Sequence, residues 1–142
     1  MSPVVAPVAA SMNPQMAPDA ATRVPPVRVG VVGYGWWGKT MARQIAMSPW
    51  LSLAAVAETH DATRQAMAHD TALQGVAVLD SAQALMAHPG LEAVILCTPH
   101  EQHAQQIMAA AQAGLHVFCE KPLCLTLADA RQEFPCAFPQ AL

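Results

Sequence analysis

Apolar segments alternate along residues 27–119 with segments in which apolar side chains recur at helical spacing. The uninterrupted apolar segments predict strands over residues 27–32, 53–57, 76–79, 93–98 and 115–119. Helices are predicted over residues 39–47, 61–69, 81–88 and 101–113. Apolar strands joined by helices are typical of a parallel sheet that is covered on both faces. Right-handed connections then predict a doubly wound α/β fold whose ligands bind at the carboxyl ends of the strands.

Local signals mark the ends of the predicted helices. Asp80 or Ser81 is suited to cap the third helix, which Pro89-Gly90 ends. Gly114 is expected to adopt the left-handed conformation common after a helix. The first helix is expected to pack on the sheet through one apolar face, formed by Met41, Ala42, Ile45 and Ala46.

A G-x-G-x-x-G sequence, with its glycines at 33, 35 and 38, joins the first predicted strand to the first helix. Gly33 allows the tight turn, Gly35 lets the backbone approach a pyrophosphate, and Gly38 lets the helix pack closely on the strand. The first N–H groups of such a helix carry a partial positive charge and bind an anion. The motif alone is weak, but the strand before it and the acid Glu58 after it predict a dinucleotide-binding site.

Glu58 follows the second predicted strand, where a carboxylate accepts hydrogen bonds from the hydroxyl groups of an adenosine ribose. A 2′-phosphate at this place would meet a like charge, so the residue favours NAD over NADP. Arg64 lies about one helical turn further on and is the residue that would receive a 2′-phosphate if it swung toward the site.

Polar residues also follow the fourth and fifth predicted strands, as Thr98-Pro99-His100 and Glu120-Lys121-Pro122. Three strand ends that converge on one crevice are the strongest indication of function in the chain. Lys121 is the candidate catalytic residue, because an ammonium over the crevice can hydrogen-bond a substrate oxygen and help to move a proton. A cis bond to Pro122 would set the direction of the lysine. The alternative is a solvated lysine at the end of a strand.

Aromatic and histidine side chains complete the candidate cofactor-binding set, which includes Tyr34 in the glycine turn. Trp36 and Trp37 are expected to cover apolar surface beside the turn or to face the ligand. His100 and His103 are expected to line the mouth of the crevice or to pair with groups at helix ends. No further cluster of metal-ligating residues accompanies the two histidines, so no metal site is predicted.

The composition narrows the classes of function. A net charge of -3 with no basic cluster argues against a nucleic-acid partner. The apolar runs are too short to cross a membrane. The four cysteines contain no C-x-x-C pair, and two of them, Cys97 and Cys119, lie in apolar strand segments, which favours a reducing cytoplasm.

The two ends of the chain differ in composition from its centre. Residues 1–26 contain many prolines and alanines, lack the features of a signal or transit peptide, and are expected to be a flexible tail. The dinucleotide-binding domain is expected to occupy residues 27–130. Residues 131–142 contain two prolines where a helix should continue, and are expected to be an irregular tail.

These motifs resemble the N-terminal domain of the Gfo/Idh/MocA family of oxidoreductases (glucose–fructose oxidoreductase, inositol dehydrogenase and relatives). The resemblance covers about residues 27–130. The sequences that carry it are VGVVGYGWWG at 29–38, AVAE at 55–58, CTPH at 97–100 with His103, and AGLHVFCEKPL at 113–123. It implies NAD(P)-dependent oxidation or reduction of a sugar, cyclitol or polyol. It also implies that Lys121 lies near the nicotinamide and the reacting carbon, and that Thr98 and Pro99 line the cofactor groove.

The resemblance also implies what this chain lacks, because members of the family carry a second α/β domain that supplies most substrate contacts. The chain is therefore expected to be a truncated or frame-shifted product, or else a naturally short member, with little activity alone and a tendency to self-associate. Three functions stay open: an oxidoreductase or its cofactor-binding part, a stand-alone NAD-binding or regulatory module, and a Rossmann-like methyltransferase. The glycine motif and Glu120-Lys121-Pro122 disfavour the third.

Overall fold

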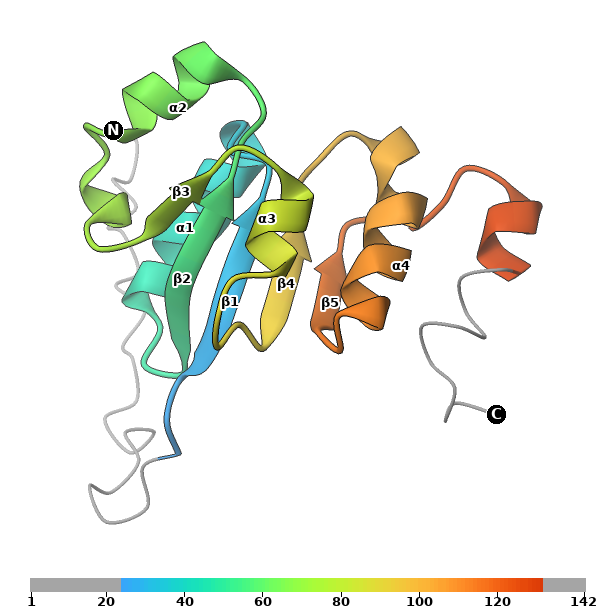
Figure 1. Ribbon diagram of the computed structural model, residues 1–142, viewed down its shortest axis with the longest axis horizontal. Coiled ribbons are helices and arrows are strands. Elements are labelled where there is room, and N and C mark those ends of the chain that lie inside the picture. The colour runs from blue at the N-terminus through green and yellow to red at the C-terminus, as the bar shows by residue number, and fades with distance from the viewer. Residues whose placement is uncertain (1–23, 132–142) are drawn as a thin grey trace, which may run out of the picture.

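The computed structural model describes residues 24–131, which form one parallel sheet with helices on both faces (Figure 1). The strands are β1 (Val27–Val32), β2 (Leu51–Ala57), β3 (Ala77–Leu79), β4 (Ala93–Leu96) and β5 (His116–Cys119). The helices are α1 (Trp36–Met47), α2 (Asp61–Met67), α3 (Ala82–Met86) and α4 (His103–Gln112), with short 3-10 turns η3 (Thr71–Leu73) and η4 (His100–Gln102). Residues 127–131 are also helical. The predicted flexible tail, residues 1–26, lies outside the described residues as far as residue 23. The predicted irregular tail, residues 131–142, lies outside them from residue 132 on.

The five strands lie in the order β3-β2-β1-β4-β5, and every neighbouring pair is parallel. The chain crosses over between β3 and β4, so the direction in which strands are added reverses beside β1. This order confirms the predicted doubly wound α/β fold, and it places the switch point between β1 and β4. The carboxyl ends of the strands meet at the upper edge of the sheet in Figure 1.

The sheet separates two apolar cores (Figure 1). On one face, Ala42 and Ile45 of α1 pack with Val31 and Val56 of the central strands. On the other face, α3 and α4 cover the sheet. The core residues of this second face include Leu85, Leu96, Ile107 and Ala110. Strands that are buried on both faces need apolar residues at every position, which is why the central strands read as continuous apolar segments.

The predicted strands and helices are present, but several of their ends differ. Helix α1 begins at Trp36, three residues before the predicted start, because the glycine turn runs directly into the helix. Strand β4 ends at Leu96 rather than at residue 98, and β2 begins at Leu51 rather than at 53. The segment predicted as a helix from residue 101 begins as a 3-10 turn and becomes α4 at His103.

Side-chain contacts correct one further expectation and decide between the two alternatives of another. Ala46 is exposed, because the contact of α1 with the sheet follows Gly38, Ala42 and Ile45 instead. Ser81, and not Asp80, caps α3, because its side chain accepts a hydrogen bond from the N–H of residue 84 at 3.3 Å. Gly114 has a φ of 72° after α4, as predicted.

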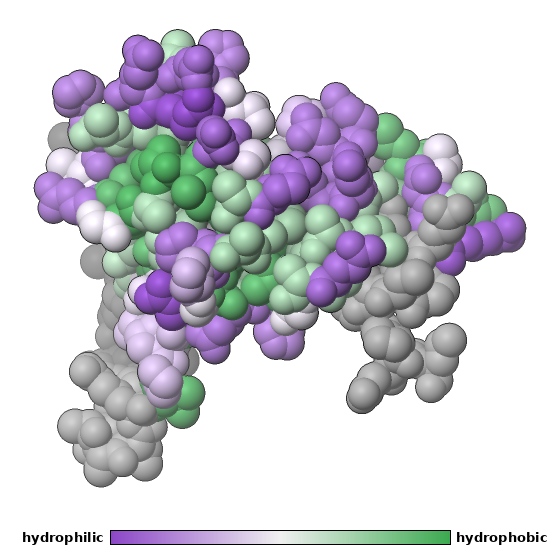
Figure 2. Space-filling view, viewed as in Figure 1, coloured by the Kyte–Doolittle hydropathy of each residue, from purple (hydrophilic) through white to green (hydrophobic). Residues whose placement is uncertain are grey.

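Polar and apolar residues are distributed unevenly over the surface. In Figure 2, hydrophilic residues cover α2 and the upper end of α4, whereas smaller apolar residues cover much of the surface below them. Between residues 24 and 131, no helix is both long enough and apolar enough to cross a membrane.

Candidate functional site

The glycine turn after β1 is shaped by two of its three glycines. Gly33 has a φ of 90°, and a Cβ on it would lie 2.8 Å from the carbonyl oxygen of Cys97. A Cβ on Gly38 would overlap the carbonyl oxygen of Gly33 itself. Backbone therefore packs directly against backbone where the turn meets the start of α1 and the end of β4. This packing leaves no room for a side chain at position 33 or 38.

Gly35 is different, because within residues 24–131, its own neighbours in the chain apart, no atom lies within 4 Å of where its Cβ would stand. Packing inside the described chain does not require glycine at this position. A ligand that approaches the backbone closely does require it, and Gly35 is the glycine that the motif assigns to the pyrophosphate. The open space over Gly35 therefore fits a dinucleotide.

The first turn of α1 supplies positive potential beside Gly35. The first bond of the helix runs from the Lys39 N–H to the Gly35 carbonyl at 3.0 Å, so the N–H groups of residues 36–38 have no acceptor within the helix. No acidic residue lies in this first turn, and no side chain caps it. In a helix of 12 residues, this end attracts an anion such as a phosphate.

Glu58 ties the glycine turn to the end of β2. Its Oε2 accepts a hydrogen bond from the Tyr34 N–H at 2.9 Å, and its Oε1 accepts one from the His60 N–H at 2.9 Å. A carboxylate offers about four lone-pair sites, so two such bonds leave acceptor capacity for a ribose. Glu58 therefore holds the turn in shape and still presents a negative charge to the site.

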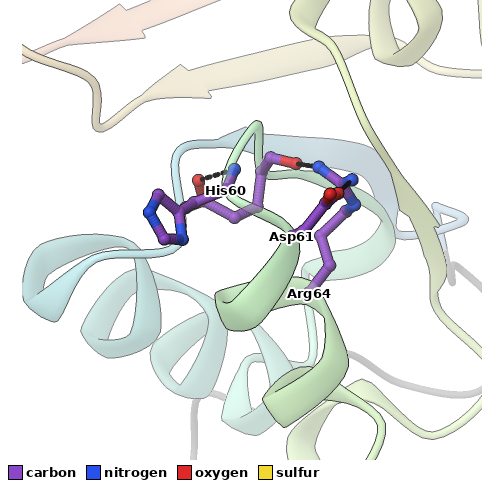
Figure 3. A network of polar contacts seen from close by, with 4 residues as sticks. His60, Asp61 and Arg64 are labelled. Atoms are coloured by element: carbon purple, nitrogen blue, oxygen red, sulfur yellow. Dashed lines mark hydrogen bonds and ion pairs between the residues drawn. The ribbon is translucent and has the colours of Figure 1, made fainter.

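Arg64 is held on α2 beside Glu58. Its Nη1 donates to the backbone carbonyl of Glu58 at 2.6 Å, and its Nη2 pairs with the Asp61 carboxylate. Figure 3 shows the side chain of Arg64 directed toward Asp61 along the first turn of the helix. A movement of Arg64 toward a ligand would have to break both contacts.

Two adjoining cavities lie above the carboxyl ends of the strands and share Cys97 and Thr98. The first, of about 470 Å³, extends from the glycine turn to α4. Its predicted lining residues are Gly33, Gly35, Glu58, Thr98 and Pro99, and it is also lined by His60, Gln102 and Gln106. The second, of about 390 Å³, is lined by Trp37, Thr98, His100, His103, Glu120 and Lys121, together with Leu96 and Cys97. The structure thus brings together the three strand ends that the sequence singled out.

Lys121 lines the second cavity. It is exposed, and within residues 24–131 its ammonium has no hydrogen-bond or ion-pair partner. The bond from Lys121 to Pro122 is cis, as the sequence suggested. Glu120 beside it is half-buried and lines the same cavity.

His103 lies beneath this cavity rather than at its mouth. The side chain is only 1% exposed, and its two ring nitrogens contact backbone carbonyls. Nδ1 lies 2.9 Å from the oxygen of Pro122, and Nε2 lies 3.0 Å from that of Thr98. The exposed ring of His100 stands edge-on to the His103 ring, with the centroids 5.5 Å apart.

The remaining predicted residues occupy other places. Tyr34 turns its side chain into the core, where its hydroxyl donates to Asp70 at 2.9 Å. Trp36 is 79% exposed and stacks on Trp37 with the centroids 5.7 Å apart. The Nε1 of Trp37 is buried without a partner among the described residues, next to the cavity that holds Lys121.

The surroundings of Cys97, Tyr34 and Asp70 shift the pKa values of these three groups. Burial raises the pKa of the Cys97 thiol to about 12, with Glu120 and Cys119 adding to the effect, so the thiol is protonated at neutral pH. Burial and Asp70 raise the pKa of the Tyr34 phenol. The N–H of Ala72 and the Tyr34 hydroxyl lower the pKa of Asp70. Neither Cys97 nor Tyr34 is therefore suited to act as a nucleophile or base here.

Sequence reasoning missed Gln102 and Gln106, whose side chains lie at the wall of the first cavity. The Thr98 hydroxyl donates to Gln106 at 2.5 Å, and Gln106 donates to Gln102 at 3.2 Å. Their spacing of four residues was a possible signal, because it places both on one face of a helix that follows a strand end. Within the described part of the chain, no group of three or more metal-ligating side chains is assembled.

The fold and this site match a known family. The Gfo/Idh/MocA model, an oxidoreductase family with an NAD-binding Rossmann fold, matches residues 27–137. The chain belongs to this family. It spans about a third of the length of the family members that it matches, and within them it corresponds to the NAD-binding Rossmann domain.

Several similar proteins have named activities. The chain is 36% identical to inositol 2-dehydrogenase of Agrobacterium fabrum over 75% of its own length and 32% of that protein. It is 31% identical to myo-inositol 2-dehydrogenase of Thermotoga maritima over 72% of its length and 30% of that protein. Among solved structures, scyllo-inositol dehydrogenase from Lactobacillus casei with bound NAD(H) and scyllo-inositol has a TM-score of 0.72 at 30% identity, covering 82% of this chain and 34% of that one.

Proposed function

We propose that this chain supplies the NAD-binding part of an oxidoreductase that acts on a CH–OH carbon of a sugar, cyclitol or polyol. The observation that carries the proposal is the open space over Gly35 at the positive end of α1, with the carboxylate of Glu58 beside it. The inositol dehydrogenases among its relatives support the class of substrate.

The contacts of Glu58 and Arg64 favour NAD over NADP. The Glu58 carboxylate is set in place by two backbone N–H groups, and its remaining lone pairs suit the hydroxyl groups of a ribose. A 2′-phosphate would face this negative charge. The nearest cation, Arg64, is already bonded to the Glu58 carbonyl and to Asp61. Its rearrangement would cost two hydrogen bonds.

The second cavity suits the reacting end of the cofactor and the substrate. A bound nicotinamide supplies the hydride acceptor or donor. Lys121 is proposed to donate a hydrogen bond to the substrate oxygen at the carbon that is oxidised or reduced, and to help move the proton of that oxygen. Thr98, Pro99 and His100 are proposed to form the wall against which the cofactor lies, with Trp37 and Glu120 around it. Pro122 is proposed to contribute from beside Lys121, although it lines neither cavity.

Hydride transfer needs a substrate held close to the nicotinamide, and a misplacement of about 1 Å costs about a hundredfold in rate. Within residues 24–131, Lys121 has no partner side chain that would complete an acid–base pair. We therefore propose that residues 1–142 alone have little or no dehydrogenase activity. The same observation favours a second candidate, a nucleotide-binding or regulatory module without catalysis.

The cysteines and the net charge bear on the cellular location and on the class of partner. We propose a cytoplasmic protein with reduced cysteines, because the thiol of Cys97 is buried in an apolar strand end. A net charge of -3 argues against a nucleic-acid partner, which a basic surface would attract.

Titration of the purified chain with NADH, NADPH and S-adenosylmethionine tests the cofactor. Tryptophan fluorescence is the signal, because Trp37 lines the second cavity. We expect weak binding of NADH, weaker binding of NADPH and none of S-adenosylmethionine. NADPH binding as tight as NADH binding would refute the argument from Glu58. Turnover assays with polyols and NAD separate the two candidates, since measurable oxidation by this chain would exclude the non-catalytic module.

A further inference from the structure

The buried His103 ring joins two segments that are far apart in the sequence. Its Nε2 contacts the carbonyl of Thr98, directly after β4, at 3.0 Å, and its Nδ1 contacts the carbonyl of Pro122, after β5, at 2.9 Å. Pro122 is the residue next to Lys121. The ring therefore spans the floor of the cavity between its wall at Thr98 and its candidate catalytic residue.

Burial makes these contacts matter. A polar ring that is 1% exposed has no water to replace a lost partner, so loss of the hydrogen bond from its N–H to a carbonyl leaves a buried donor unpaired. By contrast, the exposed Lys121 ammonium has no bond of its own within the described chain. The position of the Lys121 backbone is thus set through its neighbour, Pro122, rather than through the lysine side chain.

The rest of the α4 amino-terminal end keeps the ring from moving. Gln106, one turn after His103, accepts a hydrogen bond from the Thr98 hydroxyl at 2.5 Å and donates to Gln102 at 3.2 Å. The Thr98 hydroxyl therefore ties the segment after β4 to α4 beside the ring. With α4 fixed in this way, a ring N–H that donates to the Pro122 carbonyl can hold the segment around Lys121 in place.

We propose that His103 is the positioning residue of Lys121, acting through the carbonyl of Pro122, and neither a cofactor ligand nor a metal ligand. This proposal rests on the proposed function only for the catalytic role of Lys121. The structural coupling itself does not require a cofactor, so it can be tested in the chain without one.

The chain has only two lysines, Lys39 and Lys121, which makes their amines separate reporters. Reductive methylation with ¹³C-formaldehyde gives each an NMR signal, and a K121R variant assigns them. In His103→Ala, we expect the Lys121 signal to move to its position in the urea-unfolded chain, whereas the Lys39 signal stays. His103→Asn should restore part of the shift, because its amide can still donate toward Pro122. His116→Asn, an exposed histidine at the start of β5, is the matched control.

An unchanged Lys121 signal in His103→Ala would overturn the proposal, and so would an equal shift in the His116 control. If the variants do not fold, the wild-type chain decides, because a buried ring N–H bonded to a carbonyl should exchange at least about tenfold more slowly than the ring N–H of the exposed His116. Equal exchange would refute the coupling. NADH titration of the same samples keeps the two proposals apart: failure to bind NADH counts against the proposed function, while the lysine signals, recorded without NADH, still decide the role of His103.

Discussion

The two ends of the crevice are built differently. At the β1–β2 end, the glycine turn is fixed by backbone contacts: Gly38 under Gly33, Gly33 against Cys97, and the Tyr34 N–H on Glu58. At the β5 end, Lys121 is exposed, and the described contact that holds its segment to α4 is the bond from His103 to Pro122.

The difference shows which part of the site the described chain can shape by itself. At the β1–β2 end, both strands are paired on each side, and these neighbouring strands exclude other conformations of the turn. The β5 end lies at an edge of the sheet, and exposed apolar side chains surround it, with Phe118 53% and Leu125 61% exposed. We therefore expect substitutions at the first end to affect folding, and substitutions at the second to affect association and the position of Lys121.

The largest effect is expected from Gly38→Ala. Alanine is favoured over glycine by about 1 kcal/mol inside a helix. However, its Cβ would overlap the Gly33 carbonyl, and we expect a net loss of about 3 kcal/mol in unfolding free energy, measured by urea denaturation. Gly35→Ala is the matched control, because its Cβ meets only open space. It should cost less than about 1 kcal/mol of stability, yet weaken NADH binding about tenfold. Equal stability losses in the two variants would contradict the comparison.

Glu58→Gln is expected to change both stability and binding. The amide keeps one acceptor oxygen but turns an NH₂ group toward an N–H of Tyr34 or His60, which should cost about 1–2 kcal/mol in unfolding free energy and weaken NADH binding. Glu92→Gln is the control, because Glu92 accepts from the Arg28 N–H at 2.8 Å at the other end of the sheet. It should leave NADH binding unchanged.

Glu58→Ser combined with Thr59→Arg should narrow or reverse the preference for NADH over NADPH in the same titration.

Self-association is expected through the β5 edge. An edge strand with exposed apolar side chains pairs readily with another molecule. Phe118→Lys should therefore shift the chain toward the monomer in sedimentation velocity at concentrations where the wild type associates. Val78→Lys, on the opposite edge strand β3 and 39% exposed in the wild type, is the control and should leave the association unchanged. A wild-type chain that is monomeric throughout would refute this prediction.

The smallest effect is expected from Tyr34→Phe, which removes the hydrogen bond to Asp70 and should cost about 1 kcal/mol. This bond helps to lower the pKa of Asp70 in the folded state below its unfolded-state value of about 3.9. The bond therefore contributes fully to the free energy of unfolding above that value, and the contribution is lost as the pH falls through the lower pKa of the folded state. The stability difference between wild type and variant, followed from pH 7 to pH 2, should therefore shrink on acidification. A constant difference would show that Asp70 does not contribute through its charge.

Several features of this protein were readable from short stretches of sequence. The largely apolar segments at 27–32 and 93–98 predicted strands, which the structure has as β1 and β4, with β4 ending at Leu96. The glycine spacing between strand and helix predicted the phosphate-binding turn. Strand ends in a parallel sheet meet at one edge, so Glu58 and Lys121 could be assigned to one crevice from their positions alone. Each inference needed only a local pattern and the known geometry of such sheets.

Other features depend on contacts between residues that are distant in the sequence. The sequence placed His103 at the mouth of the crevice or in a pairing with a helix end, whereas the fold buries it between Thr98 and Pro122. Tyr34 sits in the ligand-binding motif, yet its side chain crosses to Asp70 in the core. In both cases the same local sequence allows several side-chain directions. Packing of α4 and α1 against the sheet selects one of them, because a buried polar group is stable only where the fold supplies its partner.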